Sequence, residues 1–300
     1  MSKKVKTTLL TLLAMLLWGS IFPCIKVGYK VFKISSAAEI LLFAGIRFLV
    51  CGMIITVISR AMGQKADKNT KNSIIPILLT GLFAVVLHYA FTYAGLAVTD
   101  SSKTAMLKQL GVLLYICLAF LFVKDESFSV KNIIGGLIGF SGIAVMNVSN
   151  GRLKFSAGEI LIFLASVCTV VSNLTCKKAL KTNSAFIVTG ISQLFGGVVL
   201  TAAGVVLGAE IGAVTPVSAA VFAYICIASI IGYCLWYHIV GTNTLSWLFL
   251  IKFAEPVFAG VFGWLILGED IFNIRYLAAV VLIGTGIVIG SMQKKRTGSL

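Results

Sequence analysis

Residues 232–272 read GYCLWYHIVGTNTLSWLFLIKFAEPVFAGVFGWLILGEDIF, and residues 88–128 read HYAFTYAGLAVTDSSKTAMLKQLGVLLYICLAFLFVKDESF. A shift of 144 residues places the two stretches in register. The matched residues are Tyr89 with Tyr233, Tyr93 with Tyr237, Lys108 with Lys252, and Asp125-Glu126 with Glu269-Asp270. Apolar matches arise by chance in an apolar chain. Matches at a lysine, at two tyrosines and at an acidic turn are not expected by chance, and they indicate an internal repeat.

The chain around this repeat has the composition of a membrane protein. Of its 300 residues, 59% are hydrophobic and 12% are charged. Soluble domains have roughly 45–50% apolar and about 25% charged residues. The composition therefore excludes a secreted enzyme, a disordered chain and a cytosolic nucleic-acid-binding protein. The seven cysteines are scattered through apolar segments without a Cys-x-x-Cys pair, so we interpret them as packing residues.

Ten apolar runs approach the length of about 20 residues that a helix needs to cross a bilayer. We predict membrane helices at residues 6–27, 39–59, 74–97, 103–123, 132–148, 159–177, 184–207, 217–239, 245–267 and 275–291. No small-x-small cleavage site follows the first run, so we expect an uncleaved helix there. The fifth run contains four glycines that predict close helix contact: Gly135, Gly136, Gly139 and Gly142.

The distribution of lysine and arginine predicts the orientation in the membrane. With the N-terminus inside, the cytoplasmic segments hold 15 of the 25 basic residues and the outer segments hold six. Cytoplasmic loops carry such an excess. We therefore predict a multi-pass protein of the cytoplasmic (cell) membrane with both termini in the cytoplasm. The net charge of +15 is then a topology signal, and we expect no nucleic-acid partner.

The repeat and the spans together predict the fold class. Five predicted spans fall in each half, at residues 1–148 and 149–300. Because five is odd, the second half enters the membrane from the opposite side. We predict an all-α polytopic membrane protein of ten transmembrane helices, arranged as two inverted five-helix repeats in one integral membrane domain. Secondary transporters have this architecture, with a binding site near the midplane.

At this point the chain resembles a known family. The sequence motifs are Trp18-Gly19-Ser20 in the first predicted helix, Glu255-Pro256 in the ninth, and Leu267-Gly268-Glu269 at its end. With ten spans in two halves of five, they look like the EamA family of the drug/metabolite transporter superfamily. The resemblance covers essentially the whole chain. It implies a ten-helix transporter of small metabolites, often an exporter of amino acids or related compounds. The two halves differ at one of these motifs, because the first half has Gly111-Val112 where the second half has Glu255-Pro256. Any role of Glu255 is therefore not duplicated.

Lys108 and Lys252 are the most informative residues, because a cation in hydrocarbon is costly unless it is paired or hydrated. Each lies roughly 10–12 Å deep at 1.5 Å per helical residue, close to the midplane. One hypothesis is a cationic clamp for a carboxylate, phosphate or other anionic group. The phosphate-translocator branch of the same superfamily looks similar in using intramembrane lysines. The alternative is two buried lysines held by Glu255, helix C-terminal carbonyls or water.

Glu255 follows Lys252 by three residues and is expected on the same helical face. It is a candidate substrate-binding residue and a candidate proton-coupling residue. Equally, it can act only to neutralise Lys252, because an unpaired buried charge is costly. His88, near the middle of its span, is the second proton-coupling candidate. A hydrogen-bonded core histidine is the alternative for that residue.

Two prolines lie inside predicted spans and are expected to interrupt them. Pro256 has no N–H for the carbonyl of Lys252, and Pro23 has none for that of Gly19. Broken membrane helices are tolerated where they line a cavity. We therefore predict helix breaks at the cavity at Gly19, Pro23 and Pro256, with a plain packing kink as the alternative.

Aromatic side chains near the midplane are candidates for the walls of a cavity. Trp18 lies about twelve residues into the first helix. Tyr89 and Tyr93 share one helical face, as Tyr237 does with Tyr233. We propose Trp18, Tyr89, Tyr93 and Tyr237 as substrate-binding residues, with core packing as the alternative.

Two further basic residues lie in or beside the spans. Arg47, in the middle of the second span, is interpreted as structural, paired with Glu255 or a helix end. Lys26 near the outer mouth is expected to extend toward water, with attraction of anions as the alternative.

No nucleotide-binding, hydrolase or metal-binding motif occurs in the sequence. The prediction is therefore no enzyme, no catalytic residues, no metal and no cofactor. The expected partners are a small-molecule substrate and the lipid bilayer, with monomer and homodimer both left open.

The functional prediction is a secondary active transporter that works by alternating access. The expected substrate is a small polar metabolite with a carboxylate, such as an amino acid or organic acid. Export is the direction that the resemblance implies, and proton coupling is one option. The alternatives are an exchanger of phosphorylated or nucleotide-linked anions, and a non-transporting intramembrane receptor or lipid-handling protein.

Overall fold

The structure, a computed structural model, describes residues 3–65, 73–122, 129–149, 152–153, 156–271 and 273–291. The acidic turn Asp125-Glu126, which contributed to the predicted repeat, lies outside these ranges. So do the basic residues at positions 294–296 that contributed to the predicted orientation.

The regular elements that the structure describes up to Asn147 are all helices. They are α1 (Lys3–Val31), α2 (Ala37–Ala61), α3 (Ile75–Gly81), the π-helix η2 (Leu82–Leu87), α4 (His88–Ala97), α5 (Ser101–Leu107), α6 (Gln109–Phe122) and α7 (Val130–Asn147). The predicted third span is thus one continuous run, α3–η2–α4, with a π-helical turn immediately before His88. The predicted fourth span is divided at Lys108 into α5 and α6.

The C-terminal half begins with a short hairpin, which departs from the predicted all-α class by four residues. Val148 pairs with Leu153 and Ser149 with Arg152 in an antiparallel register. The elements are β1 (Val148–Ser149), β2 (Arg152–Leu153), α8 (Ala157–Ala179), α9 (Ala185–Val206), α10 (Pro216–Thr242), α11 (Leu245–Lys252), α12 (Ala254–Leu267) and α13 (Ile274–Ser291).

Among the residues that the structure describes, seven helical segments are long and apolar enough to cross a membrane. They are Val5–Val31, Ala37–Ala61, Ile75–Ala97, Ala157–Ala179, Ala185–Val206, Pro216–Thr242 and Leu245–Leu267. These coincide with seven of the predicted spans. The predicted spans at 103–123, 132–148 and 275–291 contain the shorter helices α5, α6, α7 and α13, so the number ten stays a prediction.

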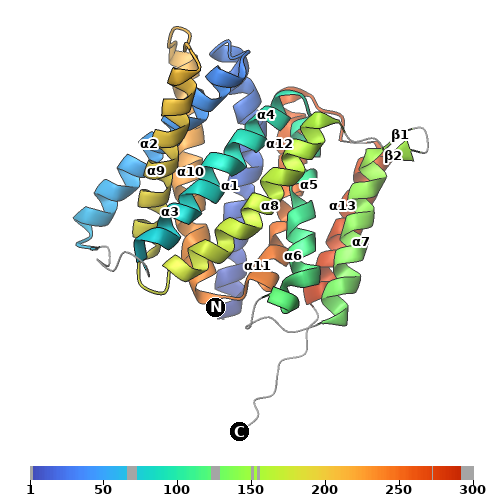
Figure 1. The fold of residues 1–300 in the computed structure, drawn as a ribbon. Coiled ribbons are helices and arrows are strands. Elements are labelled where there is room, and N and C mark those ends of the chain that lie inside the picture. The colour runs from blue at the N-terminus through green and yellow to red at the C-terminus, as the bar shows by residue number, and fades with distance from the viewer. Residues whose placement is uncertain are drawn as a thin grey trace.

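The helices form a bundle in which successive segments run in alternating directions (Figure 1). Helix α1 starts at the same end of the bundle at which α13 finishes, the lower end in Figure 1. Helices α2 and α9 pack together at one side, and α7 and α13 at the other. Between them, α1 contacts both α10 and α12, and α4 contacts α8. The central helices therefore bring distant parts of the sequence together.

Capping boxes start several helices at the upper end of the bundle in Figure 1. The Ser36 side chain accepts from the N–H of Glu39, and the Glu39 carboxylate accepts from the N–H of Ser36. Ser156 and Glu159 begin α8, and Thr215 and Ser218 begin α10, in the same manner. Each box satisfies N–H groups that have no helical acceptor. These sequence signals fix where the chain re-enters the bundle.

Glycines permit α2 and α9 to approach backbone to backbone. A Cβ atom added at Gly45 would lie 2.3 Å from the backbone nitrogen of Thr201, and one added at Gly197 would lie 2.3 Å from that of Leu49. The same holds for a second pair of glycines. A Cβ atom added at Gly52 would lie 2.4 Å from the backbone nitrogen of Leu194, and one added at Gly204 would lie 2.7 Å from that of Leu42. Small residues allow such contact between membrane helices. Within each pair, a shift of 152 residues converts one contact into the other, so that Gly45–Thr201 corresponds to Gly197–Leu49.

Helices α7 and α13 make the same kind of contact, as the glycines of the fifth predicted span suggested. A Cβ at Gly142 would lie 2.9 Å from the carbonyl oxygen of Ala279. One at Gly286 would lie 2.3 Å from the carbonyl oxygen of Gly135. Here the two contacts are related by a shift of 144 residues, the shift found in the sequence.

The seam between α2 and α9 gives a stability prediction. Gly197→Val should destabilise the protein by about 3 kcal/mol, the upper end of the usual cost of overpacking, because the new side chain overlaps the α2 backbone. The measurement is the yield of monodisperse protein in detergent, read by size-exclusion chromatography. Gly284→Val is the matched control, because no atom lies within 4 Å of a Cβ added there. Equal yields for the two variants would show that the contact between α2 and α9 accommodates a larger side chain at position 197.

The predicted breaks at Gly19 and Pro23 are wrong, because α1 is continuous from Lys3 to Val31. A proline removes one helical hydrogen bond, and the neighbouring bonds keep α1 helical. Gly19 has a different role, since a Cβ there would lie 2.9 Å from the backbone nitrogen of Ala259. It permits close contact between α1 and α12.

Candidate functional site

Two interrupted helices carry the intramembrane lysines into the centre of the bundle. Lys108 lies between the end of α5 and the start of α6, and Lys252 is the last residue of α11. Pro256 offers no N–H to the carbonyl of Lys252. The helix is interrupted at Phe253, whose N–H bonds the carbonyl of Leu250 at 3.3 Å. No proline accompanies the interruption at Lys108, so the sequence did not predict that break.

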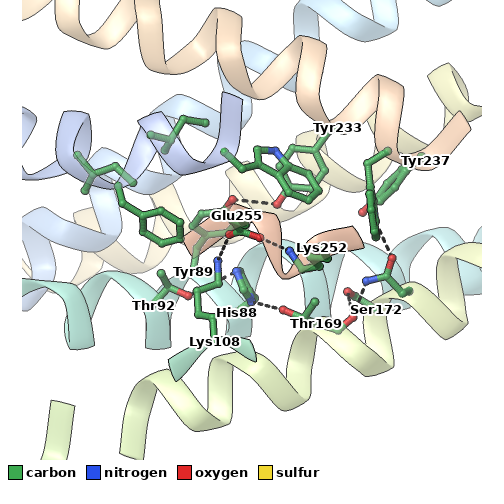
Figure 2. Close-up of a pocket in the computed structure, with 17 residues that line it drawn as sticks. His88, Tyr89, Thr92, Lys108, Thr169, Ser172, Tyr233, Tyr237, Lys252 and Glu255 are labelled. Atoms are coloured by element: carbon green, nitrogen blue, oxygen red, sulfur yellow. Dashed lines mark hydrogen bonds and ion pairs between the residues drawn. The ribbon is translucent and has the colours of Figure 1, made fainter. Parts of the chain in front are cut away.

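Glu255 lies between the two lysines (Figure 2). One carboxylate oxygen hydrogen-bonds Lys252 Nζ, and the other is 3.7 Å from Lys108 Nζ. The three side chains are buried, with exposed fractions of 8% for Lys108, 4% for Lys252 and 1% for Glu255. One carboxylate thus bridges two ammonium groups that are 144 residues apart. With all three groups ionised, this Lys–Glu–Lys triad carries one excess positive charge.

Aromatic rings cover both ammonium groups. Lys108 Nζ lies 4.7 Å from the centroid of the Phe22 ring. Lys252 Nζ lies 4.8 Å from that of Trp18 and 5.7 Å from that of Trp236. Cations over aromatic faces are attracted by the ring quadrupole, more strongly where water is excluded. The rings therefore stabilise charges that the single carboxylate does not fully balance.

The start of each following half-helix lies next to a lysine. Helix α6 begins at Gln109, and α12 begins at Ala254 with Glu255 in its first turn. The N-terminal end of a helix carries a partial positive charge and attracts anions. The C-terminal ends of α5 and α11 lie at the same breaks and carry the opposite partial charge, so the net positive charge of this region comes from two lysines against one glutamate.

The triad borders a central cavity of about 50 Å³, which has room for a few water molecules. Among the predicted site residues, the cavity is lined by Trp18, His88, Tyr89, Lys108, Tyr237, Lys252 and Glu255. Residues that the sequence did not single out as binding residues complete it: Ile21, Phe22, Ile25, Ala84, Thr92, Thr169, Ser172, Asn173, Tyr233 and Trp236.

The polar wall from α8 was missed in the sequence. Thr169, Ser172 and Asn173 all face the cavity, and Asn173 accepts a hydrogen bond of 2.7 Å from the indole of Trp236. Their spacing of three and four residues places them on one helical face. Such a polar stripe in an otherwise apolar span marks the face directed away from lipid, and this is the signal that could have identified them.

Tyrosines from corresponding positions of the repeat meet above the triad. The hydroxyl of Tyr233 donates to that of Tyr89 at 2.9 Å, and both side chains are buried. Tyr237 packs edge-on against Tyr233, with ring centroids 5.7 Å apart. These side chains form one aromatic wall of the cavity (Figure 2).

Two expectations for nearby residues are corrected by the structure. Tyr93 does not line the cavity, because its ring packs behind Tyr89 and its hydroxyl accepts from Arg47. Arg47 pairs neither with Glu255 nor with a helix end. Its guanidinium donates to Ser229 Oγ from Nε at 3.0 Å and from Nη2 at 2.6 Å, and it stacks on Phe48. Hydroxyl and aromatic partners suffice to hold this fully buried cation.

His88 is fixed by hydrogen bonds to α8. Its Nδ1 lies 2.9 Å from the carbonyl oxygen of Ala165 and 3.0 Å from Thr169 Oγ1. A carbonyl oxygen can only accept, so Nδ1 carries a proton. In the neutral ring, Nε2 is then an acceptor, and Thr92 Oγ1 lies 3.4 Å from it. His88 therefore presents one acceptor toward the α4 side of the cavity.

Comparison with known proteins gives three similarities. A family model described as EamA-like transporter family matches residues 5–148 and again residues 156–292. The uncharacterized transporter YvbV of Bacillus subtilis (strain 168) is 22% identical in an alignment of 297 positions that covers 97% of this chain and 93% of that protein. A solved crystal structure matches 98% of this chain and 99% of its own, with a TM-score of 0.74 at 16% identity. That last similarity shows the fold alone.

Proposed function

The chain belongs to the EamA-like transporter family, a family of membrane transporters, and from this premise we propose that it is a secondary active transporter of a small anionic metabolite. The observation that carries the proposal is the buried Lys–Glu–Lys triad beside the central cavity. Its excess positive charge favours a substrate with a carboxylate, such as an amino acid or organic acid. Alternating access moves this substrate across the cytoplasmic membrane, with export the direction that we favour.

The two lysines differ in how firmly Glu255 holds them, which suggests how an anion binds. Lys252 is directly hydrogen-bonded, whereas Lys108 is 3.7 Å from the carboxylate. The incoming anion replaces the weaker contact first, so Lys108 is its primary partner. The start of α6 lies beside Lys108 and adds to the attraction. Trp18, Tyr89 and Tyr237 then enclose the rest of the substrate.

We also propose that ten membrane helices form two inverted five-helix repeats, at residues 1–148 and 149–300. Two separate matches to the family model support this division. The reciprocal contacts support it as well. Gly45–Thr201 corresponds to Gly197–Leu49, and Gly142–Ala279 corresponds to Gly286–Gly135.

Counterflow in proteoliposomes tests the transport function. Vesicles loaded with one unlabelled candidate, drawn from amino acids and organic acids, should accumulate its labelled form, and protein-free vesicles should not. A thermal-shift screen first selects the candidates, because a ligand that binds the folded state raises the unfolding temperature. No carboxylate-bearing compound giving counterflow would contradict the proposed substrate class.

An exchanger of phosphorylated or nucleotide-linked anions is the second candidate. Two lysines next to two half-helix N-termini suit a phosphate group as well as a carboxylate. Inorganic phosphate should then compete in the same counterflow assay, and failure to compete would favour the carboxylate.

The orientation gives a labelling prediction. Lys181→Cys, in a variant without the native cysteines, should react with a membrane-impermeant thiol reagent only from the cytoplasmic side. Ala213→Cys should react only from outside, because it lies at the opposite end of the bundle. Both positions are exposed in loops. The reverse pattern would overturn the predicted orientation, and labelling of both from one side would contradict the alternating directions of the helices.

A further inference from the structure

Three charged residues meet at the end of the bundle that we assign to the outside. Lys26 on α1, Asp100 before α5 and Glu269 after α12 form what we name the outer ion cluster. Lys26 Nζ lies 3.8 Å from Asp100 Oδ1 and 3.8 Å from Glu269 Oε1. The N–H of Ser101 also donates to Glu269 Oε1 at 3.0 Å. The cluster therefore ties α1, α5 and α12 together at this end.

Unpaired hydroxyl groups lie on α5 between this cluster and the central site. Ser101 and Thr104 have 0% of their surface exposed. Their hydroxyls have no hydrogen-bond partner among the residues that the structure describes. A spacing of three residues from Ser101 to Thr104, and of four from Thr104 to Lys108, places all three on one side of the helix.

This concentration of unsatisfied groups needs an explanation. Nine buried side-chain atoms have no hydrogen-bond partner within the described part of the chain, and four of them lie between Thr99 and Gln109. A buried polar group without a partner costs stability. Groups of this kind are accounted for if they are satisfied in another conformation, by water or by a ligand.

The helices joined by the outer ion cluster are also those that build the site. Helix α5 leads to Lys108, α12 begins with Glu255 in its first turn, and Phe22 of α1 covers the Lys108 ammonium. Helix α5 packs against both α1 and α12. A line of polar groups therefore runs from Lys26 through Ser101 and Thr104 to Lys108, inside a junction of three helices.

We propose that this line is the route between the central site and the outside, and that the outer ion cluster is its gate. The inference deepens the proposed transport function and rests on it. When α1 separates from α5 and α12, Lys26 loses its two carboxylates, and the hydroxyls of Ser101 and Thr104 become donors for the carboxylate of the substrate. The counterpart of Asp100 in the second half is Thr244, which is uncharged. This carboxylate of the gate is therefore not duplicated in the second half.

Cysteine accessibility tests the route without knowledge of the substrate. Thr104→Cys, in a variant without the native cysteines, should react slowly with an impermeant methanethiosulfonate reagent added from outside. Adding Lys26→Gln removes both ion pairs of the gate and should raise the labelling rate about tenfold by shifting the population toward the open form. Lys26→Arg, which keeps the positive charge beside both carboxylates, should leave the rate near its initial value.

Thr80→Cys is the matched control, because Thr80 is equally buried but lies between α3 and α8, where it bonds Thr175 at 3.1 Å. Its labelling should not change with Lys26→Gln. An unchanged rate at Thr104→Cys would overturn the proposal, as would a parallel increase at Thr80→Cys. If Thr104→Cys does not fold, Ser101→Cys replaces it at nearly the same size.

The outcomes separate the gate from the transport function. Counterflow of a carboxylate with no change in labelling would leave the transport function in place and reject the route. Increased labelling at Thr104→Cys without counterflow of any anion would support the route and reject the proposed substrate class.

Discussion

Lys108→Ala is expected to reduce counterflow of the transported anion by about 100-fold, which corresponds to about 2.7 kcal/mol. The change removes the excess charge of the triad and the cation that Glu255 holds less firmly. Lys252 and Glu255 remain as a neutral, directly hydrogen-bonded pair. No unpaired buried charge is left, so the variant should still insert and fold. The loss therefore reports binding of the anion and not the integrity of the bundle.

The measurement is counterflow in proteoliposomes at matched protein content, with size-exclusion profiles as the check on folding. Lys181→Ala, at an exposed loop position, is the control and should keep wild-type rates. Lys108→Arg retains the charge with a different geometry and should keep part of the activity. Wild-type counterflow in the double variant Lys108→Ala with Lys252→Ala would show that the lysines serve structure alone.

Glu255→Gln should cause the largest loss of stability among the substitutions of the triad. The amide keeps the shape of the side chain, but the two ammonium groups then share a buried site without a carboxylate. Breaking a buried ion pair by removing one partner typically costs about 3–5 kcal/mol. The expected result is a marked fall in the thermal unfolding temperature in detergent.

A double variant tests this explanation. Combining Glu255→Gln with Lys252→Met removes one of the two buried ammonium charges that lost their carboxylate, and should recover much of the lost stability. The coupling between the two changes is then read as a double-mutant cycle. A double variant no more stable than Glu255→Gln alone would mean that the carboxylate acts through something other than charge balance.

Transport assays of Glu255→Gln decide whether the same carboxylate also carries a coupling proton. In that case net transport loses its dependence on the pH gradient, while exchange of substrate for substrate survives. If Glu255 only balances the lysines, exchange weakens as well. Unchanged proton-driven transport would eliminate Glu255 as the coupling residue and direct the test to His88.

The lysines could be predicted from the sequence because a charge in an apolar run is conspicuous. The contact of Glu255 with Lys252 followed from a separation of three residues along the chain. The contact with Lys108 did not follow, because it joins two halves of the molecule and no local rule relates them. The bridging position of Glu255 therefore required the structure.

The direction in which each helix faces was the weakest part of the sequence prediction. In a soluble helix, apolar residues mark the core. In a membrane helix, both the core and the lipid-facing sides are apolar, so periodicity says little. Tyr93 was placed in the cavity for this reason, although it packs behind Tyr89. Thr169 and Asn173 were overlooked because only polar residues reveal the inner face of such a helix.

Glycine and proline were also ambiguous in the sequence. Gly19 and Pro23 together suggested a break, but Gly19 serves close contact with α12, and α1 continues through Pro23. At Pro256 the missing N–H falls where the chain already turns at Phe253. The same residue type therefore has opposite effects, depending on whether neighbouring turns keep their hydrogen bonds.

Glu255 has no acidic counterpart, because the equivalent position in the first half is Gly111, whose N–H donates to Ser166 Oγ at 3.0 Å. In a perfectly duplicated transporter, the forms open to either side would be related by a two-fold rotation and would have equal free energy. A carboxylate carried by one half alone removes this degeneracy, since it moves with α12 and not with α6. The proposed cycle then has a preferred resting form, and the forward and return half-cycles cross barriers of different height. This difference between the two barriers is a property of the chain itself, and it is present even when the substrate gradient is zero.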